Sequence, residues 1–467
     1  MDTDSDDGYL KAVRDLNGLQ TNHQILEQIR ASGGRLNENS LPEFGSYIEK
    51  LGHQVDDLNR LNVIHVTGTK GKGSTCAFIQ SLLSHLPGRP LKIGLFTSPH
   101  LIEVRERIQI NGHPLARSEF AKYFYQTYDG LRAPSPPLRK VTEGSPATPM
   151  YFGFLTLMAY HTFLAESVDV AIMEVGVGGE YDSTNIIRQP SVCGIASLGI
   201  DHQAVLGSTI EEIAWHKAGI IKKGVEVFTV EQPESAMRVI RDRAAERLAP
   251  PPTVVSPLGA DVVLGLAGAH QRTNAALAVA LCREWIRRQG LSVESDDWVA
   301  KGLAEARWPG RSQTFASPRH PDMTWFVDGA HTVESMAACA SWFTATAAGD
   351  RPSVLLFNAA HDRNAQALLD ELNAKGCEFV EAVFCPNLSR RADSANSTVY
   401  YDSELAPQKE SARIWTAHSP DCKTTVKPTI DDAVAYIEAA YAGPVNVLVT
   451  GSLHLVGGVL DAAKGSV

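Results

Sequence analysis

Short apolar runs alternate with longer amphipathic segments through most of the chain. The runs are rich in Val, Ile and Leu and predict buried strands at 63–66, 91–96, 168–173, 192–197 and 225–230. Between them apolar residues recur at helical spacing, which predicts helices at 41–51, 76–83, 119–131, 152–166, 209–221, 234–248, 269–287 and 298–306. Residues 9–31 predict two further helices before the first strand. This alternation indicates an α/β fold, with a mostly parallel sheet flanked by helices on both faces.

The alternation restarts after the sequence Trp308-Pro309-Gly310-Arg311. Strands are expected at 324–327, 354–357, 379–384 and 445–449, with helices at 333–347, 365–375 and 431–441 and a last helix at the end. We therefore expect two domains, 1–306 and 307–467, the second a smaller Rossmann-like α/β domain. A length of 467 residues suits two or three domains. Residues 133–149 and 386–409 are polar or rich in proline and predict long loops.

A glycine-rich stretch follows the first predicted strand directly and precedes a helix. It reads Gly68-Thr69-Lys70-Gly71-Lys72-Gly73-Ser74-Thr75. Strand, glycine loop and helix together are typical of a phosphate site, because loop N–H groups and the helix N-terminus both attract anions. The stretch departs from the strict phosphate-loop pattern, since Val66 stands where the first glycine belongs and Gly73 follows the lysine. A glycine-rich turn without a ligand is the alternative.

Other polar residues follow the later strands of the first domain. They are Ser98, Glu174 and His202, in addition to Lys72 and Ser74 of the loop. The carboxyl ends of parallel strands share one edge of the sheet, where ligands bind. A carboxylate and a hydroxyl suit Mg²⁺, and a lysine neutralises phosphate. Taken singly, Glu174 as a helix cap and His202 as an ordinary loop histidine are equally good interpretations.

Three charged residues elsewhere have both a functional and an ordinary interpretation. Lys217 lies among apolar residues of a predicted helix. Its amine either extends to solvent or turns toward the expected magnesium site at the carboxyl edge of the sheet. Arg311 and Asp328 begin the second domain. They form either a surface pair or contacts to a nucleotide, with Arg311 on phosphate and Asp328 on ribose or an amine.

Composition and charge narrow the class of protein. The hydrophobic content of 44% and charged content of 21% are globular values, and the net charge of −10 argues against general nucleic-acid binding. The seven cysteines are dispersed without a C-x-x-C pair, which predicts reduced thiols in a cytosolic protein. No apolar run is long enough to span a membrane, and the acidic N-terminus fits neither a secretory signal nor a mitochondrial presequence. We expect a cytoplasmic protein, with a mitochondrial form from an upstream start left open.

Nine motifs occur in the order seen in the folylpolyglutamate synthase family of the Mur ligase superfamily. They are VTGTKGKGST, FTSPHL, ERIQING, MEVGVGGEYDSTN, GIDHQAVLG, HKAGIIK, GAHQRTNA, WPGRSQ and VDGAHTVES. The resemblance runs from about Leu16 to Gly458, and the opening LNGLQTN is similar to the fungal-type branch. Gly73 differs from the threonine usual in Mur ligases proper and agrees with the folate branch.

The resemblance implies an ATP-dependent ligase that makes amide bonds through an acyl phosphate. ATP phosphorylates the terminal γ-carboxylate of a tetrahydrofolate, the amine of L-glutamate attacks, and phosphate leaves. It also implies Mg²⁺ as cofactor, ATP as co-substrate, a monovalent cation such as K⁺, and a monomer without nucleic-acid or membrane partners. Folate is expected near the 133–152 loop and the helix after it.

The resemblance also implies roles for individual residues. Lys72, Lys217 and His202 are the expected catalytic residues, and Lys217 matches a lysine that carries a carbamate in this family. Ser98, Glu174 and His202 are the expected magnesium ligands. The expected nucleotide contacts are Gly68, Thr69, Gly71, Lys72, Gly73, Ser74, Thr75, His270, Asn274, Arg311, Asp328 and His331, with Gln271 beside His270 on the adenine side.

Two other functions remain open. A dihydrofolate synthase joins the first glutamate to dihydropteroate with the same machinery, and the residues that distinguish it lie in the pterin site. A non-catalytic ATP-binding regulator would tolerate loss of Glu174, His202 or Lys217, and all three residues are present.

Overall fold

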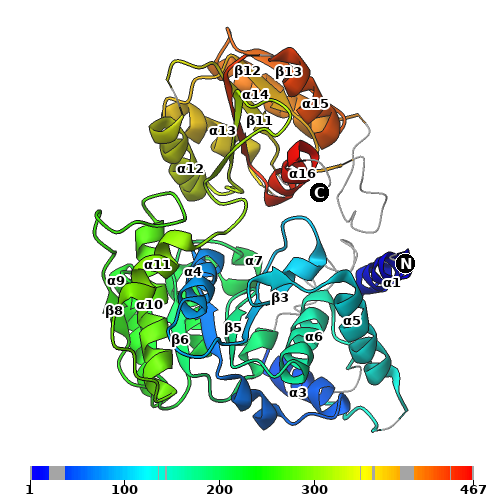
Figure 1. The fold of residues 1–467 in the computed structure, drawn as a ribbon, viewed down its shortest axis with the longest axis vertical. Coiled ribbons are helices and arrows are strands. Elements are labelled where there is room, and N and C mark those ends of the chain that lie inside the picture. The colour runs from blue at the N-terminus through cyan, green and yellow to red at the C-terminus, as the bar shows by residue number, and fades with distance from the viewer. Residues whose placement is uncertain are drawn as a thin grey trace. The chain divides into compact units, whose positions relative to one another are not determined.

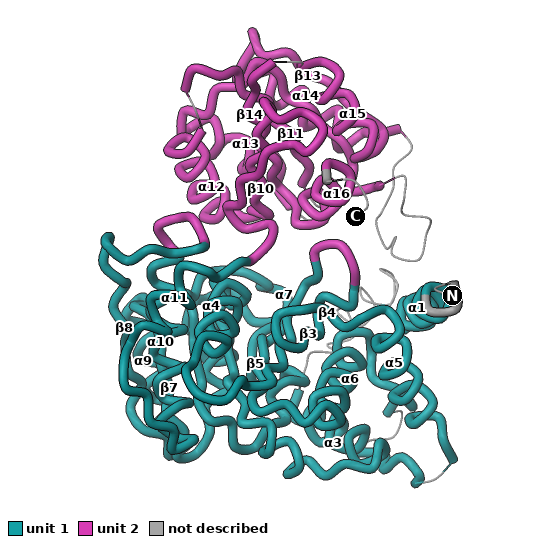
Figure 2. Tube along the Cα trace, viewed as in Figure 1, with its two compact units in different colours: residues 1–100, 104–265, 271–307 teal, residues 101–103, 266–270, 308–467 magenta. Residues whose placement is uncertain are grey.

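The chain forms two compact units (Figure 2). The computed structural model describes residues 3–19, 37–134, 136–141, 145–347, 349–359, 363–389, 404–441 and 443–464. The first unit comprises Met1–His100, Val104–Gly265 and Gln271–Arg307, and the second comprises Leu101–Glu103, Leu266–His270 and Trp308–Val467. Two short segments that precede Trp308 in sequence thus belong to the second unit.

The first unit is built on a sheet flanked by helices (Figure 1). The sheet has eight strands in the order β4-β3-β2-β5-β1-β6-β7-β8. Its parallel strands are β1 (Ile64–Thr67), β2 (Ile93–Phe96), β5 (Val170–Glu174), β6 (Val192–Ile195), β7 (Val227–Val230) and β8 (Thr253–Val255). The hairpin of β3 (Ile108–Ile110) and β4 (His113–Pro114) joins β2 in antiparallel fashion. The expected mostly parallel sheet is confirmed.

Alternate residues of the central strands face opposite layers of helices. In β6, Cys193 and Ile195 pack in one cluster with residues of α8 (Ile210–Lys217) and α9 (Glu234–Glu246). Gly194 between them faces α10 (Gln271–Arg288), and a Cβ atom there would lie 2.6 Å from Leu281 Cδ1. The two-residue period of a strand explains why both faces of the sheet are covered and why these runs are apolar throughout.

Most of the remaining helices of this unit match the expected ranges, but α4 begins four residues earlier than expected and α7 was not predicted. These remaining helices are α1 (Thr3–Asn17), α3 (Ser40–Lys50), α4 (Lys72–Ser84), α5 (Arg117–Arg132), α6 (Tyr151–Ala165), the short α7 (Gln203–Leu206) and α11 (Asp297–Glu305). The second helix expected within 9–31 lies outside the described residues. The expected loop at 133–149 separates α5 from α6.

The second unit has a six-stranded sheet with the order β13-β12-β11-β14-β10-β9. Its parallel strands are β10 (Met323–Val327), β11 (Ser353–Phe357), β12 (Glu381–Phe384), β13 (Lys423–Val426) and β14 (Val445–Thr450), while β9 (Gln313–Ala316) is antiparallel. Its helices are α12 (Val333–Thr346), α13 (Ala365–Ala374), α14 (Ala406–His418), α15 (Ile430–Ala440) and α16 (Leu453–Lys464).

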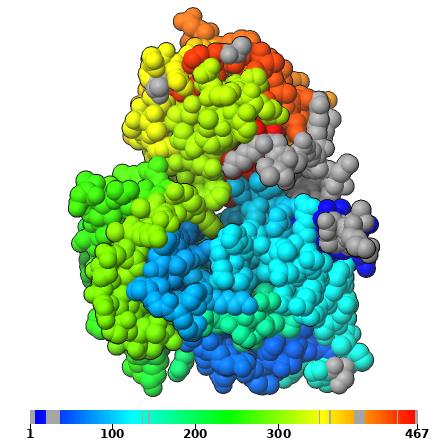
Figure 3. All heavy atoms as spheres, viewed as in Figure 1, coloured from blue at the N-terminus to red at the C-terminus, as the bar shows by residue number. Residues whose placement is uncertain are grey.

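This sheet too is covered on both faces. Leu355 and Phe357 of β11 pack with α12, α13 and α14, whereas Val354 and Leu356 pack with α15 and α16. The all-atom view shows side chains covering the ribbons on one face of each unit (Figure 3). The seven cysteines are free and buried. Among the helices of the described ranges, none combines the length and apolar character needed to cross a bilayer.

Candidate active site

The loop between β1 and α4 has the shape of a phosphate-binding loop. Gly68 has a φ of +151° and Gly71 a φ of +85°, which glycine adopts readily and other residues do not. The N–H groups of Thr69 and Lys70 donate to the carbonyl of Ser197 at 2.9 and 3.0 Å, which ties the loop to the end of β6. The loop therefore leads into the N-terminus of a 13-residue helix, where backbone N–H groups attract an anion.

Two side chains of α10 pack against this loop. Asn274 Nδ2 donates to Gln271 Oε1 at 2.9 Å, and Gln271 Nε2 donates to Ser74 Oγ at 3.3 Å. A Cβ atom at position 71 would overlap Asn274 Oδ1. The side-chain amide of Asn274 can therefore pack in this place only because residue 71 is a glycine. The buried hydroxyl of Thr75 has no hydrogen-bond partner among the described residues. Asn274 and Gln271, expected near adenine, thus lie beside the phosphate loop.

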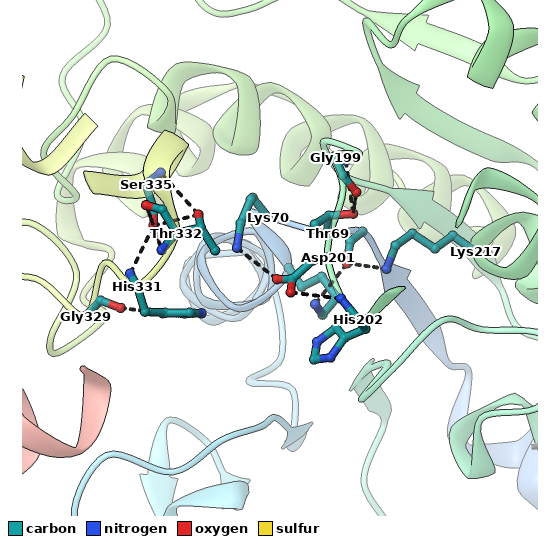
Figure 4. A network of polar contacts seen from close by, with 12 residues as sticks. Thr69, Lys70, Gly199, Asp201, His202, Lys217, Gly329, His331, Thr332 and Ser335 are labelled. Atoms are coloured by element: carbon teal, nitrogen blue, oxygen red, sulfur yellow. Dashed lines mark hydrogen bonds and ion pairs between the residues drawn. The ribbon is translucent and has the colours of Figure 1, made fainter. Parts of the chain in front are cut away.

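Two lysines converge on one carbonyl of the loop. Lys72 Nζ and Lys217 Nζ each donate to the oxygen of Gly68 at 2.9 Å, although Lys217 comes from α8, far along the chain. Figure 4 shows the side chain of Lys217. Two amines this close to each other would repel if both were charged. The arrangement therefore favours the neutral form of one of them, or an anion bound beside them.

The pKa of Lys217 reflects this position. Its side chain is buried, with 3% exposed. Burial lowers its pKa well below the ordinary lysine value, and the nearby Lys72 lowers it further, while Asp201 and Asp182 oppose the shift. The interpretation that this amine extends to solvent is wrong. The structure places it inside the unit, at the phosphate loop.

Glu174, the last residue of β5, is a buried carboxylate at the same edge of the sheet. It accepts hydrogen bonds from the hydroxyl of Thr97 and, at 3.1 Å, from the N–H of Ser98. The interpretation of Glu174 as a helix cap is wrong, because the helix that follows Gly179, Ser183–Ile186, is capped by Asp182 instead. Ser98 and Glu174 are therefore together, as expected, and Thr97 is a contact that sequence analysis missed.

The segment after Glu174 is held by a second buried carboxylate that sequence analysis also missed. Asp182 accepts from the N–H of Val177 at 3.1 Å and from both the N–H and the hydroxyl of Thr184, at 3.0 and 2.6 Å. Thr67 Oγ1 donates to the carbonyl of Gly178 at 2.7 Å. These bonds fix the glycine-rich turn against β1. The signal in the sequence was an aspartate within the motif MEVGVGGEYDSTN.

His202 precedes the short helix α7 and is exposed, with a φ of +53°. Its N–H donates to Asp201 Oδ1 at 2.9 Å, and the other oxygen of Asp201 forms an ion pair of 3.1 Å with Lys70 (Figure 4). Thr69 Oγ1 and Gly199 exchange two hydrogen bonds of 3.0 and 3.1 Å. The strand-end segment that carries His202 is thus tied to the phosphate loop through Lys70 and Thr69. Lys70 and Asp201 were not predicted as site residues.

The second unit brings the remaining expected residues near one another. Asp328 is buried, and its Oδ2 accepts from the N–H and hydroxyl of Ser312 at 2.7 and 3.1 Å. Arg311 reaches the carbonyl of Gly329 at 3.5 Å, and His331 Nδ1 donates to the same oxygen at 2.7 Å. His270 is close enough to Asp328 and Arg311 to interact with both electrostatically. The alternative of a surface pair is wrong, since Asp328 is bound by Ser312 instead.

The residues at the sheet edge fit magnesium chemically. A magnesium ion in a nucleotide enzyme takes one or two protein oxygens, and the rest of its ligands come from phosphate and water. The buried Glu174 carboxylate and the Ser98 hydroxyl offer such oxygens. Within the described ranges no group of three or more His, Cys, Asp or Glu side chains is arranged to hold a metal.

The fold and the loop together define a two-unit α/β protein of the phosphate-loop type. No protein-family model matches the chain. The chain is 40% identical to the mitochondrial folylpolyglutamate synthase of Homo sapiens, over 97% of this chain and 91% of the human protein. It is also 40% identical to the folylpolyglutamate synthase of Saccharomyces cerevisiae strain AWRI796, over 97% of this chain and 86% of the yeast protein. The chain belongs to the folylpolyglutamate synthase family.

A solved structure supports the fold independently. The ADP complex of the Mycobacterium tuberculosis folylpolyglutamate synthase is 23% identical and superposes with a TM-score of 0.78, covering 99% of both chains. The expected family and fold class are therefore confirmed.

Proposed function

We propose that this chain uses ATP to add L-glutamate to the γ-carboxylate of tetrahydrofolate and its polyglutamates, with release of ADP and phosphate. The observation that carries the proposal is the convergence of Lys72 and Lys217 on the carbonyl of Gly68. This pair of amines lies at a helix N-terminus and on the same sheet edge as the buried Glu174. Membership of the folylpolyglutamate synthase family indicates the substrates.

The chemistry needs an electrophile stronger than a carboxylate. Transfer of the γ-phosphoryl group of ATP to the folate carboxylate gives an acyl phosphate. The amine of glutamate attacks the acyl carbon, and the C–O bond to phosphate breaks as the amide forms. Loop N–H groups, the N-terminus of α4 and Lys72 hold the transferred phosphate by position and charge. In this proposal Lys72 exchanges the Gly68 oxygen for a phosphate oxygen.

Lys217 has a separate role. Its lowered pKa favours the neutral amine, the form that reacts with CO₂ to give a carbamate. Carbamate formation would turn a buried amine next to Lys72 into an anion, which the charged Lys72 would attract. We assign Lys217 this role because its position matches the family's carbamate lysine.

We assign Mg²⁺ to Ser98, Glu174 and His202, with ATP oxygens as further ligands. When bound, the ion would neutralise charge on the phosphates. The hydrogen bonds from Thr97 and Ser98 hold the Glu174 carboxylate in place. A monovalent cation such as K⁺ has no assigned site.

We assign residues 1–306 to ATP and folate binding, and residues 307–467 to a Rossmann-like glutamate ligase domain. In the second unit Arg311, Asp328, His331 and His270 are the proposed nucleotide contacts, and their mutual proximity supports this. We also propose a monomer without nucleic-acid or membrane partners. Its expected compartment is the cytosol, and the name of the human relative makes mitochondria the second compartment to examine.

The deciding experiment is ATP- and Mg²⁺-dependent incorporation of labelled glutamate, with tetrahydrofolate and dihydropteroate offered side by side. Lys72→Ala tests the loop lysine, and Lys223→Ala is the matched control because Lys223 is exposed. We expect incorporation into tetrahydrofolate only, abolished by Lys72→Ala and unchanged by Lys223→Ala. Incorporation into dihydropteroate alone would identify a dihydrofolate synthase. ATP binding with no incorporation of glutamate into either substrate would favour the alternative of a non-catalytic ATP-binding regulator.

A further inference from the structure

Arg107 is a buried cation that the proposed mechanism does not use. It ends a short 3₁₀ turn, Val104–Arg107, immediately before β3, and only 9% of it is exposed. Its Nε–H donates to His100 Nδ1 at 2.9 Å, and its guanidinium carbon lies 5.4 Å from the ring centroid of Tyr151. The plane of the guanidinium is thus held by a hydrogen bond and an aromatic ring.

Most hydrogen-bond donors of this guanidinium are unused. An arginine has five N–H donors, and Nε–H accounts for one of them. Among the residues that the structure describes, no acceptor is hydrogen-bonded to the two terminal nitrogens of Arg107. None of the ion pairs formed between these described residues includes Arg107. A buried charge without partners is unfavourable unless something compensates it. The four free N–H groups form the planar fork that binds a carboxylate through two parallel bonds.

The position of Arg107 in the sheet connects it to the reaction centre. Its carbonyl accepts the N–H of Thr97 at 3.0 Å, and the hydroxyl of Thr97 holds Glu174. The Glu174 carboxylate is near enough to favour the charged form of Arg107, which burial disfavours. The backbone therefore places the guanidinium beside the carboxyl end of β2.

The strand order separates Arg107 from the nucleotide. The sheet runs β3-β2-β5-β1, so the end of β2 is two strands from the phosphate loop after β1, roughly 10 Å away at the usual spacing. The γ-phosphate is already served by the loop, α4 and Lys72. The group that meets Arg107 should therefore belong to a substrate that approaches the phosphate from the β2 side.

We propose that Arg107 is a substrate-binding residue that holds a carboxylate of one of the two carboxylate substrates, glutamate or the glutamyl tail of folate. The inference rests on the proposed function. A carboxylate matches the fork in shape and charge, and Tyr151 would leave only the edge of the guanidinium open to it. Fixing one carboxylate of the amino acid or of the folate tail orients the reacting amine or γ-carboxylate toward the phosphate.

The test compares Arg107→Gln and Arg107→Lys with Arg105→Gln, which removes the same charge two residues earlier in the same turn. Arg105 donates instead to the carbonyl of Leu115 at 3.0 Å. We expect Arg107→Gln to raise the KM of one carboxylate substrate by about 10- to 100-fold, the loss typical of a charged hydrogen bond. The KM of ATP should change less than about twofold. Arg107→Lys should be intermediate, and Arg105→Gln should match the native chain.

The separate KM values for glutamate and for folate show which substrate supplies the carboxylate. A raised KM for glutamate alone assigns Arg107 to the amino acid, and a raised KM for folate alone assigns it to the folate tail. Unchanged KM values for both substrates overturn the inference. If Arg107→Gln also loses ATP binding, its raised KM could reflect a disturbed fold. In that case the test is Arg107→Ala with added methylguanidinium, which can replace the missing side-chain group. Recovery of glutamate incorporation supports the inference, and no recovery overturns it.

Direct binding keeps this inference separate from the proposed function. Calorimetry of glutamate and of tetrahydrofolate with the ATP-loaded native chain and with Arg107→Gln needs no turnover. A native chain that binds these ligands but adds no glutamate contradicts the proposed function alone. Equal affinities for native chain and variant contradict the role of Arg107 alone.

Discussion

Gly71 allows the geometry of the phosphate loop to be tested quantitatively. Its φ of +85° is unfavourable for alanine by about 1–2 kcal/mol, partly offset by about 0.4–1 kcal/mol from the stiffer unfolded chain. A Cβ atom there would also overlap Asn274 Oδ1. The amide must then move and lose its 2.9 Å bond to Gln271, which adds about 1–3 kcal/mol for buried groups. We expect Gly71→Ala to lower the free energy of unfolding by about 2–4 kcal/mol.

Gly52→Ala is the matched control for this substitution. Gly52 has a φ of +81°, nearly the same, and nothing lies within 4 Å of a Cβ atom built there. This control therefore reports the backbone term alone, about 1 kcal/mol or less. The difference between the two variants measures the contact with Asn274.

Urea denaturation followed by circular dichroism gives both free energies, and calorimetry gives ATP affinity. We expect only Gly71→Ala to weaken ATP binding, because only that residue shapes the loop. Adding Asn274→Ala should make the Gly71→Ala substitution less costly, with a coupling of about 1 kcal/mol between the two positions. Equal destabilisation by Gly71→Ala and Gly52→Ala would refute the reasoning, as would additivity of the Gly71 and Asn274 changes.

Two further predictions concern buried charges. Lys217→Met should lower the rate of glutamate incorporation by at least about 100-fold. It should also change how stability depends on pH. Because the pKa of Lys217 is lowered in the folded chain, the unfolded chain binds one more proton from that lowered pKa up to about 10.4. The native chain thus gains stability as pH rises through this window, a slope that Lys217→Met should lack in urea titrations at several pH values. Asp328→Ala should destabilise the second unit by about 1–3 kcal/mol, since the buried N–H of Ser312 loses its acceptor. Asp328→Asn keeps an acceptor oxygen and should retain most of that stability while weakening nucleotide binding.

Each of these predictions has a clear contrary outcome. The same pH slope with and without Lys217→Met would show that this lysine is not the group that titrates. Equal loss of stability in Asp328→Asn and Asp328→Ala would mean that the charge, not the acceptor, supports Ser312. Unchanged nucleotide affinity in Asp328→Asn would remove Asp328 from the proposed nucleotide contacts.

Edge elements were the part of the fold that sequence analysis missed. The strands β8, β9 and β13 and the helices α7 and α14 were not predicted. The strand β8 is only three residues long, Thr253–Val255, and Thr253 and Val254 are exposed, so its apolar run is too short to predict a strand. The strand β13 reads KTTV, and α14 begins in a polar stretch that resembles a loop. Central strands were predicted because burial on both faces demands continuous apolar residues.

The sequence by itself determined the central strands and helices, the glycine loop, and the set of polar residues that follow the strands. It could do so because these features depend on local spacing, and because parallel strands bring their carboxyl ends to one edge. Only the tertiary structure decided which groups meet there. The chain has to fold before Lys217 reaches Gly68, Asn274 meets Gly71, and Arg107 is buried with its fork unpaired beside Thr97. The physical reason is that burial and charge depend on neighbours distant in sequence, which no local pattern records.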